Sequence, residues 1–179
     1  MLKQAWAERP RNWRDSGWVW LWISVVALVA DQITKWLTVA YMEYAQVIPL
    51  IPNLNLRYVH NEGAAFSFLA DAGGWQRWGF ALFALLVSAG LVAMLRAERA
   101  GNRLLGCAYA LILGGAIGNL IDRVAYGYVI DFIDFYVGNW HWPAFNIADS
   151  AICVGAGLMI LDAFLQSKSA QPANGGPNE

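Results

Sequence analysis

Residues 104–121 read Leu-Leu-Gly-Cys-Ala-Tyr-Ala-Leu-Ile-Leu-Gly-Gly-Ala-Ile-Gly-Asn-Leu-Ile, without a single charged side chain. A helix needs roughly 20 predominantly apolar residues to cross about 30 Å of hydrocarbon. Residues 78–95 meet this requirement, again without a charge. Residues 18–37 and 145–165 are equally apolar except for two charged side chains each. The sequence therefore predicts four membrane-spanning helices, at about 18–37, 78–95, 104–121 and 147–165.

The composition also indicates an integral membrane protein. Of the 179 residues, 58% are hydrophobic and 14% are charged, whereas a typical soluble domain carries about 25% charged residues. The net charge of -1 leaves no basic excess for binding nucleic acid. Two cysteines are too few for a disulfide-stapled secreted domain, and the high hydrophobic content excludes a disordered chain.

Positively charged residues predict the orientation, because Lys and Arg accumulate in the cytoplasmic segments of membrane proteins. The N-terminal arm, the short loop before the third helix and the tail together contain eight: Lys3, Arg9, Arg11, Arg14, Arg96, Arg99, Arg103 and Lys168. The long segments 38–77 and 123–146 contain three: Arg57, Arg77 and Arg123. We therefore expect both termini in the cytoplasm and both long segments outside.

The domain organisation follows from these spans. We expect one membrane domain at residues 18–166, preceded by a cytoplasmic arm at residues 1–17 and followed by a disordered cytoplasmic tail at residues 167–179. Within the outer segment 40–75, residues 46–60 hold alternating apolar side chains and two prolines. This pattern is typical of short edge strands. We expect a four-helix, all-α membrane protein that carries a small sheet on the outer membrane surface.

Glycines predict close packing of the third and fourth helices. Gly114 and Gly118 are spaced i, i+4 in the third helix, and Gly155-Ala156-Gly157 lies in the fourth. Small residues let helix backbones approach each other in lipid.

Polar residues gather at one depth, the outer end of the predicted helices. Ionisable residues within spans are costly and therefore mark functional sites by default. The set comprises Asp31, Lys35, Asn119, Asp122, Arg123, Asp131, Asp134, Asn146 and Asp149. Separate explanations stay open for some members: Asp31 and Lys35 could form an i, i+4 ion pair. Asp149 could cap the fourth helix, and Asp134 could be a solvated loop carboxylate.

Aspartates are the commonest residues in this set of polar residues. Neither His60 nor His141 has zinc-peptidase spacing, and no Gly-x-Ser-x-Gly elbow occurs. Two Asp carboxyls in a low-dielectric pocket cannot both ionise easily, so the pKa of one rises. The ionised one can activate a water while the protonated one donates to the substrate. The residues alone do not choose the pair.

Two other functions use the same carboxylates. A proton-coupled carrier needs them as a relay, although its polar residues should extend through the full membrane depth. A scaffold subunit would use buried charges only to specify helix pairing.

Five motifs carry a resemblance to a known family. In order, they are Asp31-Gln32-Ile33-Thr34-Lys35, Asn61-Glu62-Gly63-Ala64-Ala65-Phe66, Gly114-Gly115-Ala116-Ile117-Gly118-Asn119-Leu120-Ile121-Asp122-Arg123, Val129-Ile130-Asp131-Phe132 and Phe145-Asn146-Ile147-Ala148-Asp149. Between about residue 18 and residue 166, the chain resembles the bacterial lipoprotein signal peptidases (signal peptidase II, or prolipoprotein signal peptidase), a family of aspartic peptidases.

The resemblance implies that Asp131 and Asp149 form the catalytic dyad. It places supporting or substrate-binding roles on seven further residues: Asn61, Asn119, Asp122, Arg123, Asn146, Asp31 and Lys35. It also implies that residues 44–75 supply both the outer sheet and a short outer helix over the site.

The implied reaction removes the signal peptide from diacylglyceryl-modified prolipoproteins, with the cut before the lipidated Cys. The expected location is the bacterial inner membrane, with the active site at the outer face. We expect a monomer in contact with membrane lipid, with no metal, no cofactor and no nucleic-acid partner.

Overall fold

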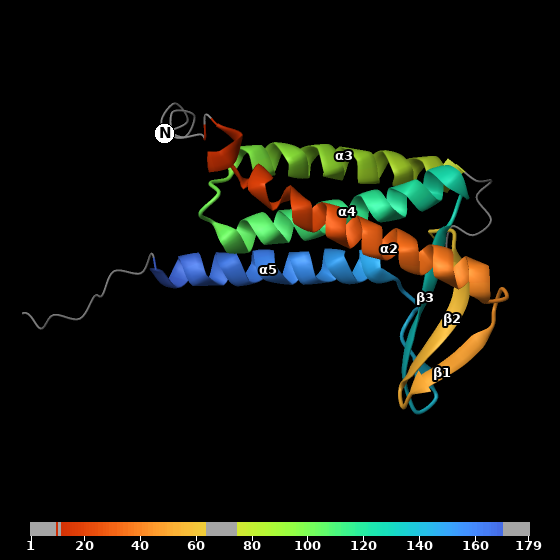
Figure 1. Ribbon diagram of the computed structural model, residues 1–179. Coiled ribbons are helices and arrows are strands. Elements are labelled where there is room, and N and C mark those ends of the chain that lie inside the picture. Colours follow the sequence, from red (N-terminus) through yellow and green to blue (C-terminus); the bar gives the residue numbers. More distant parts are fainter. Residues whose placement is uncertain (1–9, 11, 64–74, 170–179) are drawn as a thin grey trace, which may run out of the picture.

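The computed structural model describes residues 10, 12–63 and 75–169. In this part of the chain, four long helices lie side by side and a small sheet projects from one end of them (Figure 1). The helices are α2 (Leu21–Tyr41), α3 (Trp75–Ala97), α4 (Arg103–Ala125) and α5 (Ile147–Ser169). Each includes a stretch long and apolar enough to cross a membrane. The predicted fold class is therefore confirmed.

The helices extend beyond the predicted spans. α4 continues to Ala125 instead of ending near residue 121, and α5 continues to Ser169. Two short 3-10 turns, η1 (Trp13–Asp15) and η2 (Gly17–Trp20), precede α2. The predicted limits followed the apolar stretch, whereas a helix continues into the interface because its backbone groups remain hydrogen-bonded there.

α4 is the central helix of the bundle. Of its apolar window, 56% of the residues are buried, against 22% in each of the other three helices. Its glycines permit this position: a Cβ on Gly114 would lie 2.7 Å from the Ser24 carbonyl oxygen of α2. On α5, a Cβ on Gly155 would lie 2.7 Å from the Ala108 carbonyl oxygen. The predicted close packing of α4 against α5 is confirmed at Gly155, whereas Gly114 packs against α2 instead.

Four antiparallel strands form the sheet, in the order β1-β2-β3-β4. They are β1 (Val47–Ile51), β2 (Leu54–Asn61), β3 (Val129–Val137) and β4 (Trp140–His141). The strands predicted within residues 46–60 are confirmed, whereas the sequence had assigned no strand to residues 123–146. β3 follows α4 after a short turn and pairs with β2, where Asn61 lies opposite Val129.

The sheet lies at the end of the bundle where α4 ends and α5 begins (Figure 1). η1 and the C-terminal end of α5 lie at the opposite end. The predicted short outer helix falls on residues 64–74, which are outside the described residues, as are residues 1–9 of the arm and 170–179 of the tail.

Candidate active site

The N-terminus of α5 is held by a reciprocal pair of hydrogen bonds. Asn146 precedes the helix, and its Oδ1 accepts a hydrogen bond from the Asp149 backbone N–H at 2.9 Å. In return, Asp149 Oδ2 accepts a hydrogen bond from the Asn146 backbone N–H at 3.3 Å. This is the arrangement of a capping box. The N-cap residue is therefore Asn146, and Asp149, which the sequence offered as a cap, is its partner in the first helical turn. Asp149 Oδ1 additionally accepts a hydrogen bond from Asn119 Nδ2 at 2.7 Å.

Asp131 lies on β3, with only 1% of its surface exposed. Its Oδ2 accepts a hydrogen bond from Asn61 Nδ2 of β2 at 2.9 Å. Its Oδ1 accepts one from Asn146 Nδ2 at 2.7 Å. Asn146 therefore bonds both Asp131 and Asp149, and this one residue joins the two carboxyl groups.

The surroundings of Asp131 favour a protonated carboxyl group. Burial raises the pKa of Asp131 to about 7, and the charge of the neighbouring Asp149 acts in the same direction. The hydrogen bonds from Asn61 and Asn146 favour the ionised form and act against this rise. At neutral pH, Asp131 is therefore close to its pKa and can both hold and release a proton.

The buried ammonium group of Lys35 is linked to Asp149 through Asn119. Lys35 Nζ is 2.9 Å from Asp31 Oδ2 and 2.8 Å from Asp122 Oδ2. It also donates a hydrogen bond to Asn119 Oδ1 at 2.9 Å. The predicted i, i+4 ion pair is confirmed, but it is one part of a larger network. The bond to Asn119 also orients that amide so that its Nδ2 faces Asp149.

The two carboxylates bound to Lys35 hold the backbone beside Asp131 and Asp149. Asp122 Oδ2 accepts a hydrogen bond from the Ile130 backbone N–H at 3.1 Å. Asp31 Oδ1 accepts one from the Ala148 backbone N–H at 2.8 Å. Ile130 and Ala148 directly precede Asp131 and Asp149 in the chain. One ion cluster thus fixes the position of both strand β3 and helix α5.

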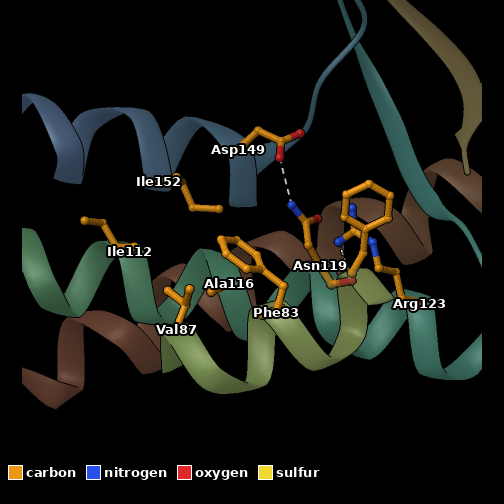
Figure 2. A pocket seen from close by; sticks show the side chains of 10 residues that line it. Phe83, Val87, Ile112, Ala116, Asn119, Arg123, Asp149 and Ile152 are labelled. Atoms are coloured by element: carbon orange, nitrogen blue, oxygen red, sulfur yellow. Dashed lines mark hydrogen bonds between the residues drawn. The ribbon is translucent and has the colours of Figure 1, made fainter. Parts of the chain in front are cut away.

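A cavity of about 290 Å³ opens beside Asp149, between α3, α4 and α5 (Figure 2). Its polar lining consists of Asn119, Arg123 and Asp149. Its apolar lining consists of Phe80, Phe83, Ala84, Val87, Ile112, Ala116 and Ile152. Arg123 Nη1 donates to the Asn119 carbonyl oxygen at 3.2 Å, and its guanidinium carbon lies 5.4 Å from the centre of the Phe80 ring. The cavity thus offers donors at its polar end and an apolar channel along the helices.

The structure brings all the predicted site residues into one connected network. Hydrogen bonds and ion pairs join the following nine: Asp31, Lys35, Asn61, Asn119, Asp122, Arg123, Asp131, Asn146 and Asp149. The sequence had missed Gln32, whose Nε2 donates to Asp31 Oδ2 and to Asp122 Oδ1, both at 3.2 Å. The available signal was its place inside the Asp31–Lys35 motif.

Asp134 is not the solvated loop carboxylate that we expected. It is 1% exposed on β3, accepts a hydrogen bond from Asn55 Nδ2 at 2.9 Å, and contacts His141 Nδ1 at 2.7 Å. The prediction was wrong because it placed this residue in a loop. On a paired strand, its side chain packs between β2 and β4 instead.

The fold and the site define a class: an integral membrane protein with two aspartates, Asp131 and Asp149, whose carboxyl groups both accept hydrogen bonds from one asparagine at one end of its helices. Comparisons with known proteins agree with this class. A family model described as signal peptidase (SPase) II matches residues 23–165. A lipoprotein signal peptidase of Shewanella pealeana is 51% identical over 166 residues, which are 93% of this chain and 98% of that relative.

Another lipoprotein signal peptidase, from Escherichia coli O157:H7, is 53% identical over 155 residues, or 87% of this chain and 94% of the relative. Two solved structures described as bacterial membrane enzymes have TM-scores of 0.74 and 0.72, each at 31% identity. The alignments cover 89% and 81% of this chain and 94% and 92% of theirs. The chain belongs to the signal peptidase II family, and it is a membrane protease of lipoprotein processing.

Proposed function

We propose that this protease is an aspartic endopeptidase that cuts diacylglyceryl-modified prolipoproteins directly before the lipidated Cys. The observation that carries the proposal is the position of Asn146, whose amide and backbone bond Asp131 and Asp149 at once. The Asp149 charge also acts on Asp131, and carboxyl groups that interact in this way titrate as a pair.

The proposed chemistry needs one proton on the dyad. The ionised carboxylate removes a proton from a water molecule, whose oxygen attacks the scissile carbonyl carbon. The protonated carboxyl donates to the carbonyl oxygen, and a tetrahedral intermediate forms. As the intermediate collapses, one of its two hydroxyl groups returns a proton to the dyad and a carboxyl product forms. The C–N bond breaks, and the leaving amine takes a proton from the dyad. The dyad finishes with one proton, as it began.

Arg123 and Asn119 are proposed to bind the peptide. Both line the polar end of the cavity beside Asp149 (Figure 2). A guanidinium group there can donate to peptide carbonyl oxygens that would otherwise be left unpaired at the membrane boundary. The apolar channel below them would receive the hydrophobic part of the signal peptide.

The proposed location is the bacterial inner membrane, with the dyad at the outer face. The support comes from charge: the end of the bundle opposite the site carries Arg14, Arg96, Arg99, Arg103 and Lys168. Positive residues favour the cytoplasmic side. Every residue of the proposed site comes from one chain, so a monomer suffices for the reaction.

The direct test is cleavage of a purified lipidated precursor by two variants, Asp131→Asn and Asp149→Asn. Each should lose at least about a thousandfold in rate, because general acid–base catalysis by a carboxyl pair contributes on this scale. Asp162→Asn is the matched control, since Asp162 lies on the same helix at the far end from the site. Normal cleavage by either dyad variant would refute the assignment.

A further inference from the structure

Asp149 lies on the wall of two different cavities. The first is the cavity that Arg123 also lines. The second is a groove of about 380 Å³, within the usual size range of about 300–1,000 Å³ for ligand pockets. Its lining residues are Trp142, Phe145, Asp149, Ser150, Cys153 and Val154. Asp149 is the one residue that the two cavities have in common.

The second groove lies on the outward face of α5. The inward face of this helix carries Ala148, Ala151 and Gly155, which are buried. Cys153 and Val154 are exposed. With 3.6 residues per turn, Cys153 projects almost opposite to the centre of the buried stripe. In a membrane this face of α5 meets lipid, and Trp142 and Phe145 from the preceding segment form the other wall of the groove.

The two cavities differ in the polar groups that they offer. The first presents a guanidinium and an amide, from Arg123 and Asn119. The second presents no cation among its lining residues. Its Ser150 hydroxyl already donates to the Asn146 carbonyl oxygen at 2.9 Å. Apart from Asp149 and the indole N–H of Trp142, the second groove is therefore mainly apolar and suits an aliphatic ligand.

We infer that the second groove holds the acyl chains of the substrate's diacylglyceryl group, while the first cavity takes the peptide. The inference rests on the proposed function. The lipid is attached to the residue directly after the scissile bond, so its chains must start beside the dyad. Asp149 lines the second groove together with Cys153 and Val154, which are exposed on the outward face of α5. Acyl chains can thus reach the dyad from the bilayer without crossing the polar network.

The test compares precursors that differ only in acyl length, dioctanoyl against dipalmitoyl. The acyl chains leave bilayer hydrocarbon and not water, so a preference between the two lipids comes from van der Waals packing against the groove walls. The parent chain should prefer the longer lipid by at least about tenfold in kcat/KM. Cys153→Trp fills the groove and should reduce this preference at least about tenfold. Ile160→Trp is the control, since Ile160 is an exposed residue of the same helix outside both cavities. It should keep the parent preference.

A second readout covers the case in which Cys153→Trp does not fold. In a Cys107→Ser, Asp131→Asn chain, Cys153 is the single thiol, and a lipidated precursor should slow its alkylation by a small membrane-permeant reagent. The unlipidated precursor should not. Equal alkylation with both precursors would overturn the inference and would indicate that ordinary membrane lipid fills the groove.

The two proposals fail in different ways. If the parent chain cleaves no lipidated precursor, the proposed function is wrong. If it cleaves the precursor and Cys153→Trp retains the full chain-length preference, the groove assignment is wrong and the proposed function stands.

Discussion

At the scale of single residues, the proposed mechanism makes the pH dependence of cleavage follow the proton shared by Asp131 and Asp149. The pKa of Asp131 is raised to about 7 by burial and by Asp149. Above this pH the pair loses the proton that the mechanism needs. We expect kcat/KM to fall about tenfold per pH unit on the alkaline side of pH 7. A profile measured in lipid that stays flat to about pH 9 would contradict this assignment.

The same raised pKa affects stability. The ordinary Asp pKa is 3.8, so ionisation costs the folded state more than the unfolded state. The cost is absent below about pH 4, grows as the pH rises toward 7, and is constant above. Asp131→Asn removes it. We predict that the melting temperature of Asp131→Asn, relative to the parent, rises by a few degrees between pH 5 and pH 8. A relative melting temperature that does not change with pH would show that Asp131 ionises normally.

Asp31 is predicted to position the start of α5, because its Oδ1 accepts a hydrogen bond from the Ala148 backbone N–H at 2.8 Å. Asp31→Asn keeps an acceptor there, whereas Asp31→Ala leaves a buried N–H without a partner, which costs about 1–3 kcal/mol. We expect Asp31→Ala to reduce kcat about ten- to a hundredfold more than Asp31→Asn does, with KM little changed. Equal losses in the two variants would mean that the charge of Asp31, and not its bond to α5, is what matters.

At the scale of elements, the close contact of α2 with α4 depends on glycine at position 118. A Cβ on Gly118 would lie 2.5 Å from Asp31 Oδ2. Gly118→Ala should therefore displace Asp31 and reduce cleavage at least about tenfold. Gly157→Ala is the matched control, because a Cβ on Gly157 meets nothing within 4 Å. Similar activity in the two variants would show that the helix contact tolerates the added methyl group.

Helices were easier to predict from the sequence than the sheet. Residues 104–121 are apolar without interruption, and this signal needs no tertiary information. Strand β3 (Val129–Val137) lacks a clear alternation, because Asp131 and Asp134 are both buried in it. Their partners, Asn61 and Asn55, are about 70 or more residues away in the chain. A strand stabilised by such distant amides leaves no periodic pattern in its own sequence.

The residues of the site could be predicted from the sequence, but the hydrogen bonds between them could not. Charged residues inside apolar spans pointed to Asp31 and Lys35, and the ordered motifs pointed to Asp131 and Asp149. The role of Asn146 as the link between two carboxyl groups depends on where β3 meets α5. That meeting is a property of the folded chain and cannot be deduced from residue spacing.

At the scale of the whole molecule, the orientation makes a prediction about access. Asn139, between β3 and β4, should face outside, and Gly101, between α3 and α4, should face the cytoplasm; both are exposed. In a Cys107→Ser, Cys153→Ser background, a membrane-impermeant thiol reagent added to intact cells should label Asn139→Cys and not Gly101→Cys. The reverse pattern would place the dyad on the cytosolic face.

The account as a whole depends on a proton shared by two carboxyl groups at the end of the bundle. Carbon-13 NMR of aspartate side-chain carboxyls in the lipid-embedded protein measures this directly. We predict one resonance that titrates near pH 7, vanishes in Asp131→Asn and moves to lower pH in Asp149→Asn. If Asp131 instead titrates near its ordinary value of 3.8 and ignores the substitution of Asp149, the two groups share no proton and the proposed mechanism is wrong.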